Sequence, residues 1–279
     1  LMAASMAVFA NAVWAFVTSE GTATRWSALQ VIVATYGGAL GMGSAWMFNE
    51  LGSCSYPQHL EHRNLCKENL KQIGLGFNTH YDEDQRFSDL VVTTGQQCRS
   101  WRVDLLPYVG EQDLPDPYVD TAAWNHEVNL PAAKHRVGAY VRPSTPEPRD
   151  SRQRWFTAYA GVRGPNSMFP EGRGLMIGDI ADGSTNTFMI VEACGRQIVW
   201  TEPRDIDVSR QQFGVNLPGE QPGRSHGLLS SYHRDGAHVL MADGSVRFIS
   251  EDASPELLRA LSTASRADSI PEDWLRLYW

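Results

Sequence analysis

Two apolar stretches open the chain, and both predict helices that cross a membrane. Residues 1–18 and 28–48 contain no charged side chain. The second stretch, of 21 residues, gives a helix of about 30 Å, the thickness of the hydrocarbon layer of a bilayer. Trp26 and Trp46 lie near its ends, where indole rings prefer the membrane interfaces. We therefore expect an N-terminal transmembrane helical hairpin over residues 1–48; a buried helix pair in a soluble protein is the alternative.

A long amphipathic helix is predicted after a short linker. Gly52 and Pro57 are typical of a break in a helix, so we place a linker at residues 49–57. Apolar residues then recur every three or four positions, as one face of a helix requires. This stripe predicts a helix over residues 59–81, at the start of a domain that spans residues 58–279. The stripe residues are Cys66, Leu70, Ile73, Phe77 and Tyr81.

Two Asp-Gly pairs between apolar, β-branched runs predict β-hairpins. The first pair, Asp182-Gly183, lies within residues 175–193, and the second, Asp243-Gly244, lies within residues 237–250. Asp-Gly favours a type I′ turn, which needs a positive φ at both central residues. We therefore expect each run to fold back on itself as two antiparallel strands.

A short last helix is predicted to begin after Ser254. This residue can cap a helix, Pro255 suits its first turn and Glu256 suits the positive end of its dipole. One long helix and two hairpins predict an α+β domain in which the helix packs on an antiparallel sheet, with a loop-rich middle.

Charge follows the same division of the chain. Only Glu20, Arg25 and Glu50 are charged among the first 50 residues, although Lys, Arg, Asp and Glu make up 20% of the whole chain. The net charge is −8, and the basic residues form no continuous run. These features exclude a disordered chain and a basic nucleic-acid binder. The expected partner of residues 1–48 is the lipid bilayer, and we expect no nucleic acid.

Six ordered sequence blocks resemble a large bacterial family known as domain of unknown function 1559. The last block contains His233 and Asp243-Gly244 at the spacing of the His-x9-Asp-Gly signature, which is associated with prepilin-type proteins. The blocks are CKENLKQIGLGFNTHYDEDQRF at 66–87, SWRVDLLPYVGEQ at 100–112, FTAYAGVRGPNSMF at 156–169, DIADGSTNTFMIVEA at 179–193, VWTEPRD at 199–205 and HRDGAHVLMADGSVRF at 233–248.

The resemblance implies a pilin-like domain, carried by the bacterial inner membrane and lying in the periplasm or outside the cell. It implies no activity, and we expect its motif residues to have structural roles. These residues are Asn69, Leu70, Lys71, Asp182, Gly183, Asn186, Trp200, His233, Asp243 and Gly244. The chain departs from the family in three ways: no Gly-Phe-Thr-Leu-x-Glu prepilin motif precedes its apolar stretches, Pro57 interrupts the long pilin helix, and Arg142-Pro143-Ser144 replaces the common Cys-Pro-Ser.

Cysteine and histidine residues raise the question of disulfides and metal. Four cysteines in an extracytoplasmic domain allow two disulfides, in three connectivities that spacing does not separate. Cys54, His59, His62 and Cys66 also carry zinc-ligand groups within 13 residues. Their spacing matches no common zinc module, so we expect no metal and no cofactor. The remaining cysteines are Cys98 and Cys194.

None of the candidate catalytic patterns is complete, so we expect a protein that is not an enzyme. Gly-x-Ser-x-Gly at residues 223–227 lacks the buried strand that a nucleophile elbow requires. A contact between His233 and Asp243 would lock the last hairpin, because no nucleophile accompanies it. Oxygen groups around the first Asp-Gly pair suit either calcium or simple turn formation, and turn formation is favoured. They are Asp179, Asp182, Asn186 and Glu192.

These observations predict a membrane-anchored, non-catalytic envelope protein with a structural or recognition role. Its further partners would be other membrane or envelope proteins. The alternative is a module that binds a solute or glycan and is coupled to the membrane helices. In that alternative, aromatic faces would line a ligand cleft. The residues for such a cleft are Trp101, Trp124 and Trp155.

Overall fold

The computed structural model describes residues 55–94, 97–111, 114, 116–142, 149–219, 227–265, 270 and 274. The chain divides into two units at Leu60, and the second unit, residues 61–279, contains every described element except the first turns of the long helix. The predicted membrane segments 1–18 and 28–48 lie outside the described residues. Within the described part, no helix combines the length and apolar character needed to span a bilayer.

The long helix α3, Ser55–Asp84, confirms the predicted amphipathic helix and extends it at both ends. Pro57 lies in its first turn, where a proline costs no hydrogen bond, so α3 begins inside the predicted linker. The whole predicted stripe faces the protein interior: Cys66, Leu70, Ile73 and Phe77 are buried, and Tyr81 is partly buried against the same core. Gly74 allows α3 to approach the sheet closely, because a Cβ there would lie 2.8 Å from Leu240.

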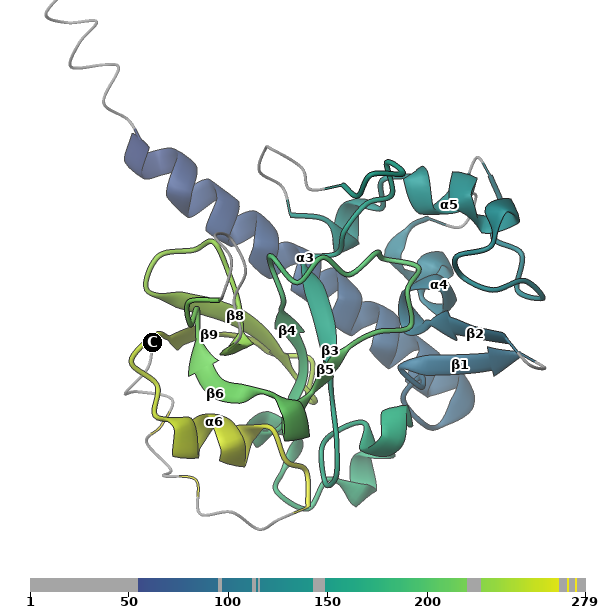
Figure 1. Cartoon of the computed structure of the whole chain (residues 1–279). Coiled ribbons are helices and arrows are strands. Elements are labelled where there is room, and N and C mark those ends of the chain that lie inside the picture. The colour runs from purple at the N-terminus through teal and green to yellow at the C-terminus, as the bar shows by residue number, and fades with distance from the viewer. Residues whose placement is uncertain are drawn as a thin grey trace, which may run out of the picture. The chain divides into compact units, whose positions relative to one another are not determined.

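A mixed sheet forms the centre of the described fold, with strand order β5-β3-β4-β8-β9 (Figure 1). The neighbours β3–β4, β4–β8 and β8–β9 are antiparallel, as predicted, but β5 pairs with β3 in parallel. The strands are β3 (Tyr159–Arg163), β4 (Phe188–Glu192), β5 (Ile206–Asp207), β8 (Gly236–Met241) and β9 (Val246–Ser250).

The remaining elements surround this sheet. Strands β1 (Val91–Thr94) and β2 (Gln97–Ser100) form a hairpin, and β6 (Gln212–Val215) pairs in parallel with β7 (Gly227–Leu229). The short helices are α4 (Trp101–Asp104), α5 (Leu130–Lys134) and α6 (Pro255–Leu261). Turns of 3-10 helix occupy Leu106–Val109, Glu127–Asn129, Gly138–Tyr140, Pro170–Gly172, Ile177–Asp179, Ser184–Asn186 and Val208–Arg210.

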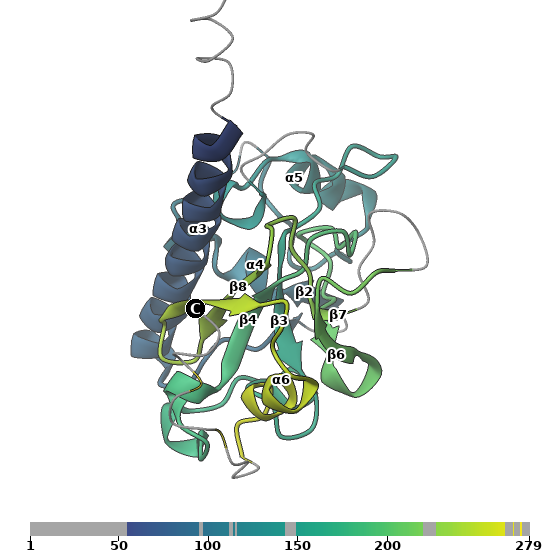
Figure 2. The same cartoon turned by 90° about the vertical axis from the view of Figure 1, so that its left-hand side faces the viewer.

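Both faces of the sheet are covered. Leu240 of β8 packs in the core beneath α3, whereas its neighbours Val239 and Met241 pack with α6. This alternation is the period of two expected of a strand. Figure 2 shows α3 along one side of the sheet and α6, β6 and β7 on the other. The α+β class is therefore confirmed, with a layer of secondary structure on each side of the sheet.

The prediction of a hairpin over residues 175–193 is wrong. Only its second half forms a strand, β4, and both edges of β4 are taken by β3 and β8. The first half contacts the segment after α3 instead, since the Phe87 backbone N–H donates to the Leu175 carbonyl at 3.3 Å. A Cβ on Gly174 would lie 2.1 Å from the Phe87 carbonyl oxygen, so glycine permits this crossing.

The second predicted hairpin, β8–β9, is confirmed, but its turn is of another type. Gly244 has a φ of 82°, whereas Asp243 is not among the residues with positive φ. The Gly244 N–H donates to the Met241 carbonyl, and the Met241 N–H donates to Ser245. This is a type I turn followed by a left-handed glycine, which needs only one positive φ. The last helix is also confirmed, because the Ser254 hydroxyl accepts from the Leu257 N–H at 3.2 Å.

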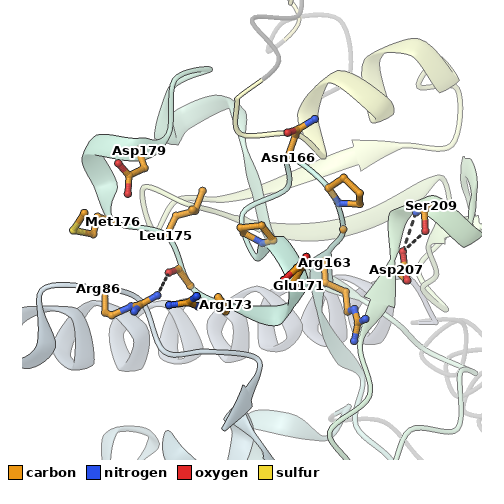
Figure 3. A pocket seen from close by; sticks show the side chains of 14 residues that line it. Arg86, Arg163, Asn166, Glu171, Arg173, Leu175, Met176, Asp179, Asp207 and Ser209 are labelled. Carbon is orange, nitrogen blue, oxygen red and sulfur yellow. Dashed lines mark hydrogen bonds between the residues drawn. The ribbon is translucent and has the colours of Figure 1, made fainter. Parts of the chain in front are cut away.

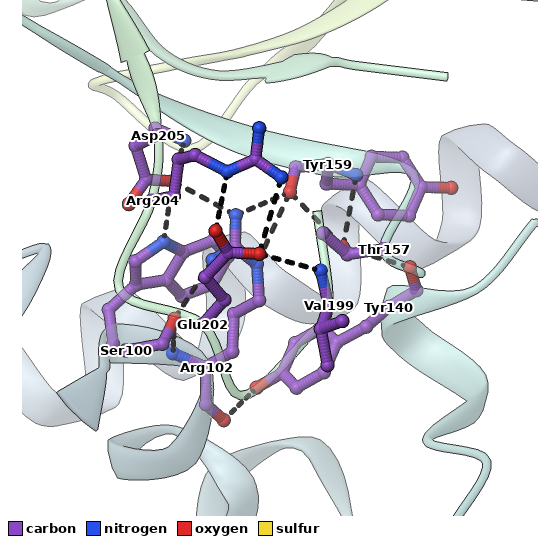
Figure 4. Close-up of polar contacts among 11 residues, drawn as sticks. Ser100, Arg102, Tyr140, Thr157, Tyr159, Val199, Glu202, Arg204 and Asp205 are labelled. Carbon is purple, nitrogen blue, oxygen red and sulfur yellow. Dashed lines mark hydrogen bonds and ion pairs between the residues drawn. The ribbon is translucent and has the colours of Figure 1, made fainter. Parts of the chain in front are cut away.

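A buried ion pair fastens α4 to the sheet. Arg102 donates to Asp205 Oδ1 at 2.9 Å, and the two side chains are 0% and 1% exposed. The same oxygen accepts from the Trp101 indole and from the Gly161 N–H, while Arg102 also donates to Ser100 and to the Tyr159 carbonyl. Figure 4 shows Arg102 between Ser100, Tyr159 and Asp205. Burial raises the pKa of the Asp205 carboxyl, and Arg102 is the chief opposing influence.

Replacement of Asp205 by Asn should strongly destabilise the protein, because it leaves the Arg102 charge buried without its counter-ion. We expect Asp205→Asn to lower the free energy of unfolding by about 3–5 kcal/mol, measured by denaturant unfolding. Glu68→Gln is the control, since it removes the carboxylate of the exposed Lys71–Glu68 pair and should cost less than about 1 kcal/mol. Equal losses for the two variants would show that the Arg102 pair is not a buried determinant of stability.

Candidate functional site

Four ionisable side chains meet at the end of the central strand β4. Glu192 is its last residue, His238 lies on the adjacent strand β8, and His233 precedes that strand. Cys66 comes from α3. The β4–β8 register pairs Val191 with Val239, which places Glu192 beside His238. Their exposed fractions are 1% for Glu192 and Cys66 and 3% for each histidine, so the cluster is buried.

The Glu192 carboxylate is the centre of the cluster. Its Oε1 lies 3.3 Å from His233 Nε2, and its Oε2 lies 3.7 Å from His238 Nδ1. Oε2 also accepts the His238 backbone N–H at 2.7 Å. The Cys66 sulfur, a Glu192 oxygen and a His233 ring nitrogen all lie within 4.8 Å of one another. Three segments distant in sequence therefore deliver a thiol, a carboxylate and an imidazole to one point.

Electrostatics keep the carboxylate charged and the thiols protonated. Burial alone would raise the pKa of the Glu192 carboxyl, but His233 and His238 oppose it and hold the pKa well below its ordinary value. Burial, assisted by the Glu192 charge, raises the pKa of the Cys66 thiol to about 12. Burial raises the pKa of Cys194 as well. Neither thiol is therefore an activated nucleophile, because only the thiolate attacks.

Hydrogen bonds to the surrounding backbone hold the turn of α3 that carries Cys66. Asn69 donates its amide to the carbonyls of Gly138 and Val141, at 3.3 and 3.2 Å. The Tyr159 hydroxyl donates to the Cys66 carbonyl at 3.3 Å. The position of the Cys66 thiol is therefore fixed by Asn69 and Tyr159, which both lie in the sequence blocks that resemble the family.

The other motif residues of α3 and of the core are not members of the cluster. Leu70 is buried in the core beneath the sheet, and Trp200 packs there against the Tyr140 ring, 6.2 Å between centroids. Lys71 is exposed and pairs with Glu68 at 2.7 Å. These three residues serve the core and the surface of the helix rather than the site.

The motif residues of the first Asp-Gly turn connect that turn to the C-terminal part of the chain. Asn186 accepts the Trp274 indole N–H at 3.2 Å and donates to the Asp182 carbonyl at 3.4 Å. Asp182 accepts from the Thr263 hydroxyl at 3.4 Å, and Gly183 has a φ of 89°. At the second turn Asp243 accepts from the backbone and hydroxyl of Ser245, and Gly244 supplies the left-handed residue.

Two groupings that the sequence allowed, the His233–Asp243 contact and the disfavoured calcium set, are not formed, because a strand separates their members. His233 precedes β8 and Asp243 follows it, and six residues of strand span about 20 Å. Glu192 ends β4, whereas Asp179, Asp182 and Asn186 precede its start, so the calcium set is divided as well. His233 meets Glu192 instead of Asp243.

The tryptophans proposed to line a ligand cleft are packing residues in this structure. Trp101 is fully buried and donates its indole N–H to Asp205 at 3.1 Å. Trp155 is 3% exposed and donates to the Lys134 carbonyl. Trp124 is half-buried, with the guanidinium of Arg154 5.4 Å from its ring centroid. The buried rings of Trp101 and Trp155 offer no face to a solute.

The described cysteines Cys66, Cys98 and Cys194 are in the free thiol form, and Cys98 alone among these three is exposed. Cys54 and the side chain of His59 lie outside the described residues, so the proposed helix zinc set is not described as a whole. Ser225 of the Gly-x-Ser-x-Gly pattern also lies outside them.

A separate cavity of about 710 Å³ opens between the loops beyond β3 (Figure 3). Arg86 and Arg173 lie on one side, and Arg163 and Asp207 lie on the other. Leu175, Met176, Glu171 and Asp179 also line it. Its residues come from segments far apart in sequence, which is why no local pattern predicted it.

Sequence reasoning missed the partnership of Glu192 with His233, His238 and Cys66. The available signal was an acidic residue at the end of an apolar run, Phe188–Glu192, because a charge in a buried strand needs a partner. His238 within the apolar run Gly236–Met241 carries the same signal.

Comparison with known proteins gives one family match. A model of the family described as "Protein of unknown function (DUF1559)" matches residues 62–256. This range contains the Cys66, Glu192, His233 and His238 cluster. No curated protein and no solved structure matches the chain.

Loss of the His233 ring should destabilise the fold, because it removes a partner of a buried carboxylate. We expect His233→Ala to lower the free energy of unfolding by about 3–5 kcal/mol, measured by denaturant unfolding. His135→Ala is a matched control: His135 lies at the same 3.3 Å from Glu111, but both side chains are more than a quarter exposed. Its loss should stay within about 1 kcal/mol. A similar small loss for His233→Ala would refute a stabilising role of the buried pair.

Proposed function

The chain belongs to the DUF1559 family, and from that premise we propose a membrane-anchored, non-catalytic envelope protein with a pseudopilin-like domain. The domain would lie outside the inner membrane, in the periplasm or at the cell exterior, and would act through contacts with other envelope proteins. The observation that carries this proposal is the engagement of the family-pattern polar residues in structural contacts.

A structural role for the pattern residues is supported by their bonding. Three of these residues form hydrogen bonds with backbone groups or with neighbouring side chains of the fold: Asn69, Asn186 and Asp243. The His233 ring lies 3.3 Å from the Glu192 carboxylate, and both side chains are 1% exposed. Catalytic groups have to reach a substrate, whereas these groups are engaged in contacts within the fold.

Display by a membrane segment is supported by residues 1–48, whose two uncharged stretches suit a bilayer. A long helix packed on an antiparallel arrangement of strands is the arrangement expected of a pilin-like domain, and α3 with β3, β4, β8 and β9 has it. The domain would then act through protein contacts of its outer surface rather than through reactive groups in a cleft.

The exposed thiol of Cys98 provides a direct test of this location. In bacterial cells with a permeabilised outer membrane and an intact inner membrane, a membrane-impermeant maleimide should label Cys98, because its side chain is exposed and those of Cys66 and Cys194 are buried. The measurement uses a Cys54→Ser background, and Cys98→Ser in that background is the control that should lose the label. Labelling only after lysis of the inner membrane would place the domain in the cytoplasm and overturn the proposal.

The cavity of about 710 Å³ favours a second candidate function, binding of a small acidic solute such as an acidic sugar. Its volume lies in the range of ligand sites, about 300–1,000 Å³. Arg163 and Arg173 supply cations for a carboxylate, while Glu171 and Asp179 can accept sugar hydroxyls. Leu175 and Met176 offer apolar contact.

Binding at this cavity can be measured by thermal shift with glucuronate and citrate. A ligand of the native state should raise the unfolding temperature by mass action. Arg173→Ala should abolish the shift, and Arg152→Ala, an exposed arginine outside the lining, should retain it. No shift with either compound, or an equal shift in both variants, would exclude acidic-solute binding at this cavity.

A further inference from the structure

We propose that Cys66, Glu192 and His233 bind a single zinc ion that fastens α3 to the sheet. The three ligands come from α3, from the end of β4 and from the segment before β8. The site is independent of the envelope role proposed above, because it concerns the interior of the domain.

The spacing of the ligand atoms suits a tetrahedral ion. Zinc binds imidazole nitrogen and carboxylate oxygen at about 2.1 Å, so two such ligands at the tetrahedral angle lie about 3.4 Å apart. Glu192 Oε1 and His233 Nε2 are 3.3 Å apart. The Cys66 sulfur lies within 4.8 Å of both groups, so closure on an ion requires a side-chain movement of only about 1 Å.

The carboxylate is already positioned for this role. Glu192 is 1% exposed, and within the described part of the chain its Oε1 accepts no hydrogen bond. The other oxygen, Oε2, is held by the His238 backbone N–H at 2.7 Å. A buried carboxylate oxygen without a hydrogen bond is costly, and a cation shared with His233 and Cys66 removes that cost.

The ligand chemistry selects zinc over the hard cations. Calcium and magnesium prefer sets of oxygen ligands, whereas thiolate, imidazole and carboxylate together are typical of zinc. Binding replaces the Cys66 thiol proton, which leaves to solvent, so the sulfur binds as a thiolate. His238 contacts Oε2 and orients the carboxylate from outside the ligand set.

The first measurement is the metal content of the whole purified protein. Elemental analysis should find about one zinc per chain, and chelation should lower the unfolding temperature, which added zinc restores. Cobalt in place of zinc should give a thiolate-to-metal charge-transfer band that Cys66→Ser lacks and Cys194→Ser keeps. A protein without stoichiometric zinc, and without a cobalt band or a zinc-dependent thermal shift, would reduce the cluster to an ion pair and overturn the proposal.

The ligand assignment is decided by Glu192→Gln against His62→Ala. Cys66 belongs both to this site and to a possible helix set with Cys54, His59 and His62, so its loss alone does not separate them. Glu192→Gln should weaken zinc binding by at least about 100-fold, which exceeds the usual effect of residues outside the ligand shell. His62→Ala should leave the affinity unchanged. The reverse result would move the zinc to the helix set and overturn this assignment. Since affinity is measured by competition with a chromophoric chelator on protein that retains its circular dichroism spectrum, misfolding is distinguished from ligand loss.

Discussion

The buried charge of Glu192 is the constraint around which this end of the domain is arranged. A carboxylate removed from water is tolerated only when hydrogen bonds and opposite charges replace the lost hydration. The His238 backbone N–H donates to one carboxylate oxygen at 2.7 Å, and the rings of His233 and His238 lie 3.3 and 3.7 Å from the carboxylate. The main chain of the same residue is also engaged, since the Ser230 N–H donates to the Glu192 carbonyl at 2.9 Å. Glu192 thereby connects β4 to β8 and to the segment after β7. It also lies beside Cys66 of α3.

The Arg102–Asp205 pair is a second buried charged group of the domain. Arg102 has a partner for its charge in Asp205, and its remaining donors reach Ser100 and the Tyr159 carbonyl. Its place in α4 makes it a tie between a short helix and the sheet. At Glu192, by contrast, a carboxylate, an imidazole and a thiol converge. Among the described residues, each of the two carboxylates has one buried oxygen without a hydrogen bond, Glu192 Oε1 and Asp205 Oδ2. The Asp205 carboxylate therefore already has a cationic partner in Arg102, whereas the groups around Glu192 are ones that can bind a metal ion.

Local patterns predicted the elements whose causes are local. The spacing of Leu70, Ile73 and Phe77 was enough for α3, and Ser254 with Pro255 was enough for α6. The hairpin at residues 175–193 failed because the partners of β4 are set by the sheet, 25 or more residues away along the chain. The predicted type I′ turn was wrong because a type I turn followed by one left-handed glycine, Gly244, closes the hairpin without a second residue of positive φ. The cluster could not be read from spacing, since helix and sheet must pack before Cys66 meets Glu192.

The His-x9-Asp-Gly spacing has a physical explanation in the two ends of β8. His233 is fixed near the start of the strand by Glu192, and Asp243-Gly244 makes the turn at its other end. The intervening positions hold the six residues of β8 and the short connections at each side. Side chains of a strand alternate between its two faces, and His238 and Leu240 share one face. One inserted residue before them would therefore turn both side chains to the opposite face of the sheet. His238 would lose Glu192, and Leu240 would leave the core beneath α3. The length and register of β8 between its two fixed ends are therefore sufficient to explain the spacing of His233 and Asp243-Gly244.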